Sequence, residues 1–205
     1  MTEPKAPAGI IGGRALKTTW QTPEYLLDPV RAYFGGQIPL DVATAPNNPT
    51  RARQFYCPTD AVNEAAQVAL FDDELVGERT GHDALELPWS PAFYCNPPYG
   101  KALKERWLPR AASQAREGAE GFLLLSCARW EQECLHELMA EANAVCWIGK
   151  RVGKHHGRVD FINPETGDAV KGNTYANMFL AFNVDFERFA EAFGKVGWCY
   201  RLGAA

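Results

Sequence analysis

The sequence predicts an α/β fold, with a mostly parallel sheet covered by helices on both faces. Short, continuous apolar runs, such as GFLLLSC at 121–127, are typical of strands buried on both faces. Segments with helical spacing of apolar residues alternate with these runs, which favours parallel strands joined by helical crossovers. The length of 205 residues suits one compact domain. We expect a flexible lead rich in Pro, Gly and Ala at 1–17, followed by the domain at 18–205.

The first half of the chain begins with a helix that carries its own start and stop signals. Thr22 is expected to cap this helix and Pro23 to occupy its first turn. Gly35 and Gly36 are expected to end it. The elements expected after it are a strand at 38–42, a short strand at 54–57, a helix at 61–76, a turn before 81–85 and a buried strand at 92–95.

The second half repeats the alternation of helix and buried strand. The elements expected here are an amphipathic helix at 101–117, a strand at 121–127, a helix at 131–142, a strand at 144–149, a polar loop at 150–172, a strand at 177–183 and a helix at 186–193. In an open α/β sheet, ligands bind at the carboxyl ends of the strands. Asp41, Asp83 and Asn96 stand at such ends.

Composition narrows the class of protein. The net charge of −4 argues against a chain held on nucleic acid by overall charge, although a local basic face is enough for DNA binding. The six cysteines form no C-x-x-C pair, so we expect reduced, buried thiols in a cytoplasmic protein. Cys and His do not cluster at ligand spacing, so no metal site is expected. No signal peptide and no apolar run of about 18 residues is present.

The motif that carries chemistry is Asn96, Pro97, Pro98, Tyr99, which leaves the end of a buried strand. Neither proline has an N–H, so the chain cannot continue in a central ladder there. The Pro97 carbonyl and the Asn96 side-chain oxygen are then free to accept hydrogen bonds. Tyr99 offers a flat aromatic face, and Gly100 lets the chain turn without a side chain.

Such a loop suits a planar molecule that carries an exocyclic amine. The two amine N–H bonds would point at the Asn96 oxygen and the Pro97 carbonyl, while the ring stacks on Tyr99. Two acceptors around a pyramidal nitrogen favour its reacting form over the flat ground state. Stacking is worth about 1–3 kcal/mol per base. The residues alone do not select adenine, and an ordinary turn between strand and helix is the simpler alternative.

A resemblance makes the prediction specific. The chain resembles the phage-type DNA N-6-adenine-methyltransferase family over most of residues 18–183. The shared patterns are W-x-T-P from Trp20, L-D-V-A-T-A-P-x-N from Leu40, F-Y-C from Phe55, D-A-L-x-x-x-W from Asp83, N-P-P-Y-G from Asn96 and L-L-L-S-C-A-R-W from Leu123. The resemblance implies a Rossmann-like methyltransferase fold, S-adenosylmethionine as methyl donor, adenine N6 in DNA as acceptor, and a phage-encoded enzyme.

The resemblance also implies which residues hold the donor. The positions that match the family's cofactor motifs are Trp20, Gln21, Thr22, Pro23, Asp41, Val42, Ala43, Thr44, Asp83, Ala84 and Asn96. Asp83 would accept a hydrogen bond from the donor's adenine amine, and Asp60 has the spacing of a ribose ligand. The family's glycine pair is replaced by Ala43 and Ala45. The simpler alternative for the acids is a strand-end or turn role, and for 20–23 an ordinary helix start.

No large separate target-recognition domain is expected, so loops must hold the DNA. The basic stretch at 150–172 is the candidate, with Arg129 ahead of it. The expected DNA-binding residues are Arg129, Lys150, Arg151, Lys154, His155 and Arg158, with His156 and Lys171 in the same loop. A solvated loop is the alternative, and Trp130 either lines the target pocket or lies in the core. In duplex DNA the target adenine must be flipped out, because N6 is paired and stacked.

Two other functions stay open on the sequence alone. Methyltransferases with N-P-P-Y motifs also act on protein glutamine or on RNA guanine, and the W-x-T-P opening and short chain favour DNA. A non-catalytic DNA-binding relative is the second alternative, because the cofactor loop lacks its glycines.

Overall fold

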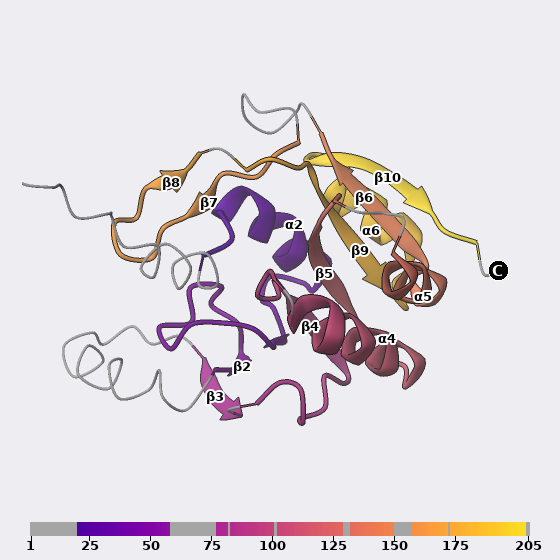
Figure 1. The fold of residues 1–205 in the computed structure, drawn as a ribbon, viewed down its shortest axis with the longest axis horizontal. Helices are drawn as coiled ribbons and strands as arrows, with labels where there is room; N and C mark the ends of the chain where they lie inside the picture. The colour runs from indigo at the N-terminus through magenta and orange to yellow at the C-terminus, as the bar shows by residue number, and fades with distance from the viewer. Residues whose placement is uncertain are drawn as a thin grey trace, which may run out of the picture.

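The structure is a computed structural model that describes residues 20–57, 77–81, 83–100, 102–128, 132–149, 157–171 and 173–203 (Figure 1). Within these residues, eight strands form one sheet in the order β10-β6-β9-β5-β4-β1-β2-β3. The strands are β1 (Leu40–Asp41), β2 (Gln54–Tyr56), β3 (Glu78–Gly81), β4 (Ala92–Cys95), β5 (Glu120–Ser126), β6 (Ala144–Ile148), β9 (Asn177–Phe182) and β10 (Gly197–Arg201). A separate hairpin is made by β7 (Phe161–Ile162) and β8 (Ala169–Val170).

The sheet is parallel over its larger part. The neighbours β5, β4, β1, β2 and β3 all run in the same direction. Strand β9 is antiparallel to both of its neighbours, β5 and β6, and β10 is antiparallel to β6. The chain leaves β1 toward β2 and β3 and then returns to β4 on the other side of β1. This reversal opens a crevice at the carboxyl ends of β1 and β4, which is where ligands bind in open α/β sheets.

Helices cover both faces, as Figure 1 shows. The helices are α2 (Glu24–Tyr33), the π-helical turn η1 (Leu103–Trp107), α4 (Leu108–Arg116), α5 (Glu133–Glu141) and α6 (Phe186–Phe193). Helices α2 and α6 contact each other on one face, and α4 and α5 contact each other on the opposite face. The predicted α/β fold with a mostly parallel sheet and helices on both faces is therefore confirmed.

The central strand β5 shows why the sheet needs two layers. Successive side chains of a strand point to opposite faces. Phe122 and Leu124 pack in the core under α2 and α6, whereas Leu123 and Leu125 pack in the core under α4 and α5. All four side chains are at most 3% exposed, so an uninterrupted apolar run is the pattern that this strand requires.

Within the described residues, the expected strands and helices recur with small shifts of their ends, apart from two corrections and one strand that was not predicted. The loop predicted at 150–172 contains the β7–β8 hairpin. The residues before Gly81 form β3, a strand with exposed, polar side chains and therefore no apolar signal. Strand β10 was not predicted, because it is an edge strand whose side chains are largely exposed.

The predicted cap of the first helix is also wrong. Pro23, and not Thr22, stands at the N-cap position of α2, and no side chain caps the helix there. The Thr22 hydroxyl is engaged by Tyr94 and Asn96 instead. Gly35 and Gly36 do end the helix: both have positive φ angles, and their N–H groups donate to the carbonyls of Ala32 and Arg31. The expected lead at 1–17 and helix at 61–76 lie outside the described residues.

Candidate active site

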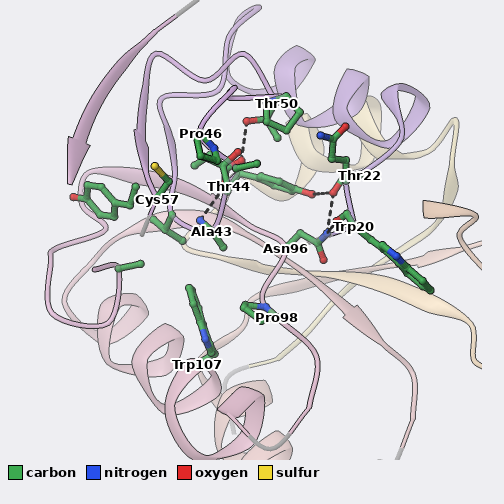
Figure 2. A pocket seen from close by; sticks show the side chains of 18 of the residues that line it. Trp20, Thr22, Ala43, Thr44, Pro46, Thr50, Cys57, Asn96, Pro98 and Trp107 are labelled. Atoms are coloured by element: carbon green, nitrogen blue, oxygen red, sulfur yellow. Dashed lines mark hydrogen bonds between the residues drawn. The ribbon is translucent and has the colours of Figure 1, made fainter. Parts of the chain in front are cut away.

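A cavity of about 350 Å³ lies at the carboxyl ends of β1 and β4 (Figure 2). This volume is within the range of about 300–1,000 Å³ that holds small ligands and cofactors. Segments far apart in the sequence form its walls: residues 20–22, 41–46, 49–50, 56–57, 83–84, 94, 96, 98 and 107. The reversal of strand order between β1 and β4 therefore creates a real cavity, as the fold predicts.

Asp41 ends β1 and holds the loop that follows it. One carboxylate oxygen accepts from the Ala43 backbone N–H at 3.0 Å, and the other accepts from the Thr50 hydroxyl at 2.7 Å. The side chain is 1% exposed. Burial raises the pKa of Asp41 to about 6, and the hydrogen bonds from Ala43 and Thr50 partly oppose that shift. The two carboxylate oxygens of Asp41 thus hold the loop of small residues that follows β1 in place beside the cavity.

Asp83 and Ala84 form another part of the wall, after β3. The Asp83 carboxylate accepts from the Leu85 backbone N–H at 2.9 Å, which holds the acid in a tight turn. The Ala84 carbonyl accepts from the Trp89 indole at 2.7 Å, and Trp89 is fully buried. The turn is therefore anchored in the core while Asp83 and Ala84 face the cavity.

The catalytic motif predicted from the sequence follows β4 directly. The Asn96 amide nitrogen donates to the Thr22 hydroxyl at 3.2 Å and to the Trp20 carbonyl at 3.4 Å (Figure 2). The Asn96 Oδ1 atom is buried and has no hydrogen-bond partner among the described residues. No described residue donates to the Pro97 carbonyl either. Within the described part of the chain, the Asn96 side-chain oxygen and the Pro97 carbonyl oxygen thus have no hydrogen-bond donor.

Tyr99 occupies a different position from Asn96. Pro98 lines the cavity, whereas Pro97 and Tyr99 do not. The Tyr99 hydroxyl donates to the Leu124 carbonyl at 3.2 Å, and its ring meets Phe161 edge-on with centroids 6.3 Å apart. Burial raises the pKa of Tyr99, so the phenol stays protonated. The stacking role expected for Tyr99 stays a prediction.

The structure brings the predicted cofactor residues together. All of them except Pro23 line the cavity: Trp20, Gln21, Thr22, Asp41, Val42, Ala43, Thr44, Asp83, Ala84 and Asn96. Pro23 is buried at the start of α2 instead. The contact of each residue with a donor stays a prediction.

The predicted DNA-binding residues fall largely outside the described residues. Those outside are Arg129, Lys150, Arg151, Lys154 and His155. Outside the described residues lie also Trp130, His156 and the expected ribose ligand Asp60. Arg158 is described, and its side chain is exposed between the buried Gly157 and Val159. The side chain of Asn177 accepts from the Val159 N–H at 3.1 Å and so holds this segment on β9. Lys171 is also exposed.

Sequence reasoning missed several residues of the cavity wall. Tyr94 and Thr50 are buried there, and Trp107 forms part of the wall from η1 (Figure 2). Tyr56 and Cys57 also line the cavity, and their F-Y-C pattern contributes to the family resemblance without predicting a role for either residue. Trp107 lies on a π-helical turn, and such turns are frequent at functional sites.

Comparison with known proteins indicates the family of the chain. A family model described as "DNA N-6-adenine-methyltransferase (Dam)" matches residues 76–193, which is more than half of the 205 residues. The chain belongs to this family. A search of curated proteins finds no match. The range matched to the Dam family contains β4, Asn96 and the helices that follow, whereas Trp20, Thr22 and Asp41 lie before it.

Membership of the Dam family implies DNA as substrate and S-adenosylmethionine as donor. No helix in the described part of the chain is long and apolar enough to cross a membrane. Nor do any three His, Cys, Asp or Glu side chains among the described residues gather closely enough to hold a metal ion. All six cysteines are free thiols.

Proposed function

We propose that this protein transfers a methyl group from S-adenosylmethionine to N6 of adenine in DNA. The observation that carries the proposal is the unpartnered, buried Asn96 Oδ1 at the end of β4, beside the cavity and in a chain of the Dam family. A buried acceptor without a partner costs free energy unless a ligand satisfies it. The exocyclic amine of a flipped-out adenine is a ligand that would do so.

The residues of the cavity fit the methyl donor. The volume is adequate, and the loop after Asp41 carries the small side chains of Val42, Ala43 and Thr44, which permit close approach. Asp83 would accept the adenine amine of the donor, with Ala84 against the ring. The start of α2 near Thr22 would attract the donor's carboxylate. When bound, S-adenosylmethionine would supply the electrophilic methyl group and leave as S-adenosylhomocysteine.

The chain's own residues then act on the acceptor amine. The Asn96 Oδ1 and the Pro97 carbonyl each accept one amine N–H, which pulls the lone pair of the nitrogen out of conjugation with the ring. Tyr99 would stack on the base. Because the methylated amine is an acidic cation that can lose its proton to water, this arrangement requires no strong general base.

We propose that DNA is held by the segment around the β7–β8 hairpin and by basic residues on either side of it. Arg158 supports this assignment, since it is exposed and follows β6, whose carboxyl end lies at the same edge of the sheet as that of β4. Arg129, Lys150, Arg151, Lys154 and His155 belong to the same proposal by sequence. They would contact phosphates, and such contacts position DNA without reading its sequence. A phage origin, which the resemblance implies, is a further part of the proposal.

Methyl transfer to competing acceptors tests the function. Labelled S-adenosylmethionine is offered with DNA, RNA or protein, and label is expected in DNA as N6-methyladenine. Label only in RNA or protein would instead support the alternative acceptors of N-P-P-Y enzymes. A folded protein that binds no donor in calorimetry would support the non-catalytic alternative.

Asn96→Ala is the decisive variant. We expect turnover to fall by about 10²–10³-fold, the loss seen when one such polar contact to a reacting group is removed, while the variant still binds the donor in calorimetry. Asn47→Ala is the matched control, since Asn47 is exposed and outside the cavity wall. Wild-type turnover in Asn96→Ala would refute the role of this amide.

A further inference from the structure

The Asn96 amide is surrounded by groups that determine which way it points. Its nitrogen faces the Trp20 carbonyl at 3.4 Å and the Thr22 hydroxyl at 3.2 Å. A carbonyl oxygen can only accept a hydrogen bond. If the amide were rotated by 180°, Oδ1 would face the Trp20 oxygen, and two acceptors would repel each other. The chain therefore selects the orientation that leaves Oδ1 free.

Thr22 is the nearer of the two partners, and its hydroxyl is itself held in place. Its hydroxyl shares a hydrogen bond of 2.7 Å with the Tyr94 hydroxyl, and both side chains are buried. A hydroxyl has one proton and two lone pairs, so Thr22 can accept from Asn96 whether it donates to Tyr94 or accepts from it. Burial raises the pKa of Tyr94, which keeps its phenol neutral.

The backbone around Thr22 is fixed as well. Gln21 exchanges two hydrogen bonds with Ile162 of β7, at 3.0 and 2.9 Å. Pro23 follows at the N-cap of α2, with its φ angle at −67°. Thr22 thus stands between two anchored neighbours, and its hydroxyl is presented to Asn96 at a defined place.

We propose that Thr22 is a positioning residue for the catalytic amide. Its hydroxyl, supported by Tyr94 and aided by the Trp20 carbonyl, holds the Asn96 nitrogen so that Oδ1 faces the acceptor amine. The inference rests on the proposed function of Asn96 and adds to it a residue from an N-terminal segment that the Dam family match does not include. It also differs from a contact between Thr22 and the donor, which would act on donor affinity.

The test replaces the hydroxyl and separates turnover from binding. In Thr22→Val, which keeps the shape and removes the acceptor, we expect kcat to fall about tenfold, the effect of one hydrogen bond. The KM for DNA and the donor Kd should stay within about twofold. Thr22→Ser, which keeps the hydroxyl, should recover most of kcat. Thr80→Val is the matched control on the exposed strand β3.

A double-mutant cycle shows whether Thr22 acts through Asn96. Asn96→Ala removes the whole amide, including the N–H that Thr22 accepts, so adding Thr22→Val there should change the residual kcat by less than about twofold. Equal factors in both backgrounds would overturn the proposal, as would unchanged kcat in Thr22→Val. Loss of donor affinity with normal kcat would make Thr22 a donor contact instead.

Folding and function are controlled separately. Should Thr22→Val fail to fold by circular dichroism, Tyr94→Phe replaces it, because this variant removes the other half of the 2.7 Å contact and should also lower kcat with unchanged donor Kd. An unchanged kcat in Tyr94→Phe would then overturn the proposal.

A wild-type protein that methylates no DNA would reject the proposed function, and the cycle is then run on whichever acceptor is methylated. An active wild type with an equally active Thr22→Val would reject only the positioning role.

Discussion

At the scale of the residue, Asp41 holds a loop in place although its burial disfavours the charged carboxylate. Both carboxylate oxygens are used to hold the loop that forms one wall of the cavity. Burial disfavours the charged form and raises the pKa of Asp41 to about 6. Ionising Asp41 therefore costs folding free energy. The residue is nevertheless needed, because the Ala43 N–H and the Thr50 hydroxyl both require an acceptor there.

The burial of Asp41 predicts that the free energy of unfolding depends on pH. A carboxyl whose folded pKa lies above its unfolded value of 3.8 stabilises the fold fully below about pH 4, and that stability is lost as pH rises through about 6. The shift corresponds to about 3 kcal/mol. In urea unfolding, we expect the stability of wild type relative to Asp41→Asn to fall by about this amount between pH 4 and 7. Parallel stability curves for the two proteins would contradict the shift.

Residues of the site differ in how far the sequence could predict them. The place of Asn96 at the end of a buried strand was predictable, because an apolar run followed by two prolines ends a central strand there, whereas its catalytic role stays a prediction. The use of the Thr22 hydroxyl was not predictable, because its partner Tyr94 is 72 positions away in the chain. A Thr before Pro-Glu reads locally as a helix cap, and only the fold shows that its hydroxyl has a better partner.

At the scale of the element, apolar periodicity predicted what is buried and missed what is exposed. Strand β5 and helix α6 were predicted nearly to the residue, because each buries a full apolar face. Strand β3 has exposed side chains, and the β7–β8 hairpin contributes only two residues per strand. Such strands form by backbone hydrogen bonds to a neighbouring strand. Backbone pairing leaves no pattern of apolar side chains in the sequence.

Helix α6 gives a test of capping. The Asp185 carboxylate accepts from the Arg188 N–H at 2.9 Å at the start of the helix. We expect Asp185→Ala to lower the free energy of unfolding by about 1 kcal/mol. Asp185→Asn should keep most of it, because asparagine also caps. Glu191→Ala on the exposed side of α6 is the control, and an equal loss there would argue against a capping effect.

At the scale of the whole molecule, Tyr33 links parts of the chain that are distant in sequence. Its hydroxyl donates to Glu120 at the start of β5 and accepts from the Asp185 N–H before α6 at 3.1 Å. The Arg188 guanidinium lies over the Tyr33 ring, 4.6 Å from its centroid. One side chain thus joins α2, β5 and α6 on the face of the sheet that they cover.

Removal of the Tyr33 hydroxyl should lower the stability of the whole fold. Tyr33→Phe leaves the Glu120 carboxylate and the Asp185 N–H without this partner, so we expect a loss of about 1–3 kcal/mol. In urea, the midpoint should fall while the slope of the transition stays constant. Tyr200→Phe is the control, since Tyr200 is 54% exposed. A midpoint equal to that of wild type would show that the link contributes nothing.

The position of β9 has a consequence for how the chain is made. Strand β5 pairs with β4 on one side and with β9 on the other, and β6 depends on β9 in the same way. During synthesis, β5 and β6 emerge well before residues 177–182 do. Until then the buried strand β5 keeps one edge open, with hydrogen-bonding groups unpaired. The nascent domain must therefore wait for its C-terminal quarter before its middle can close, and this long-range pairing predicts slow folding.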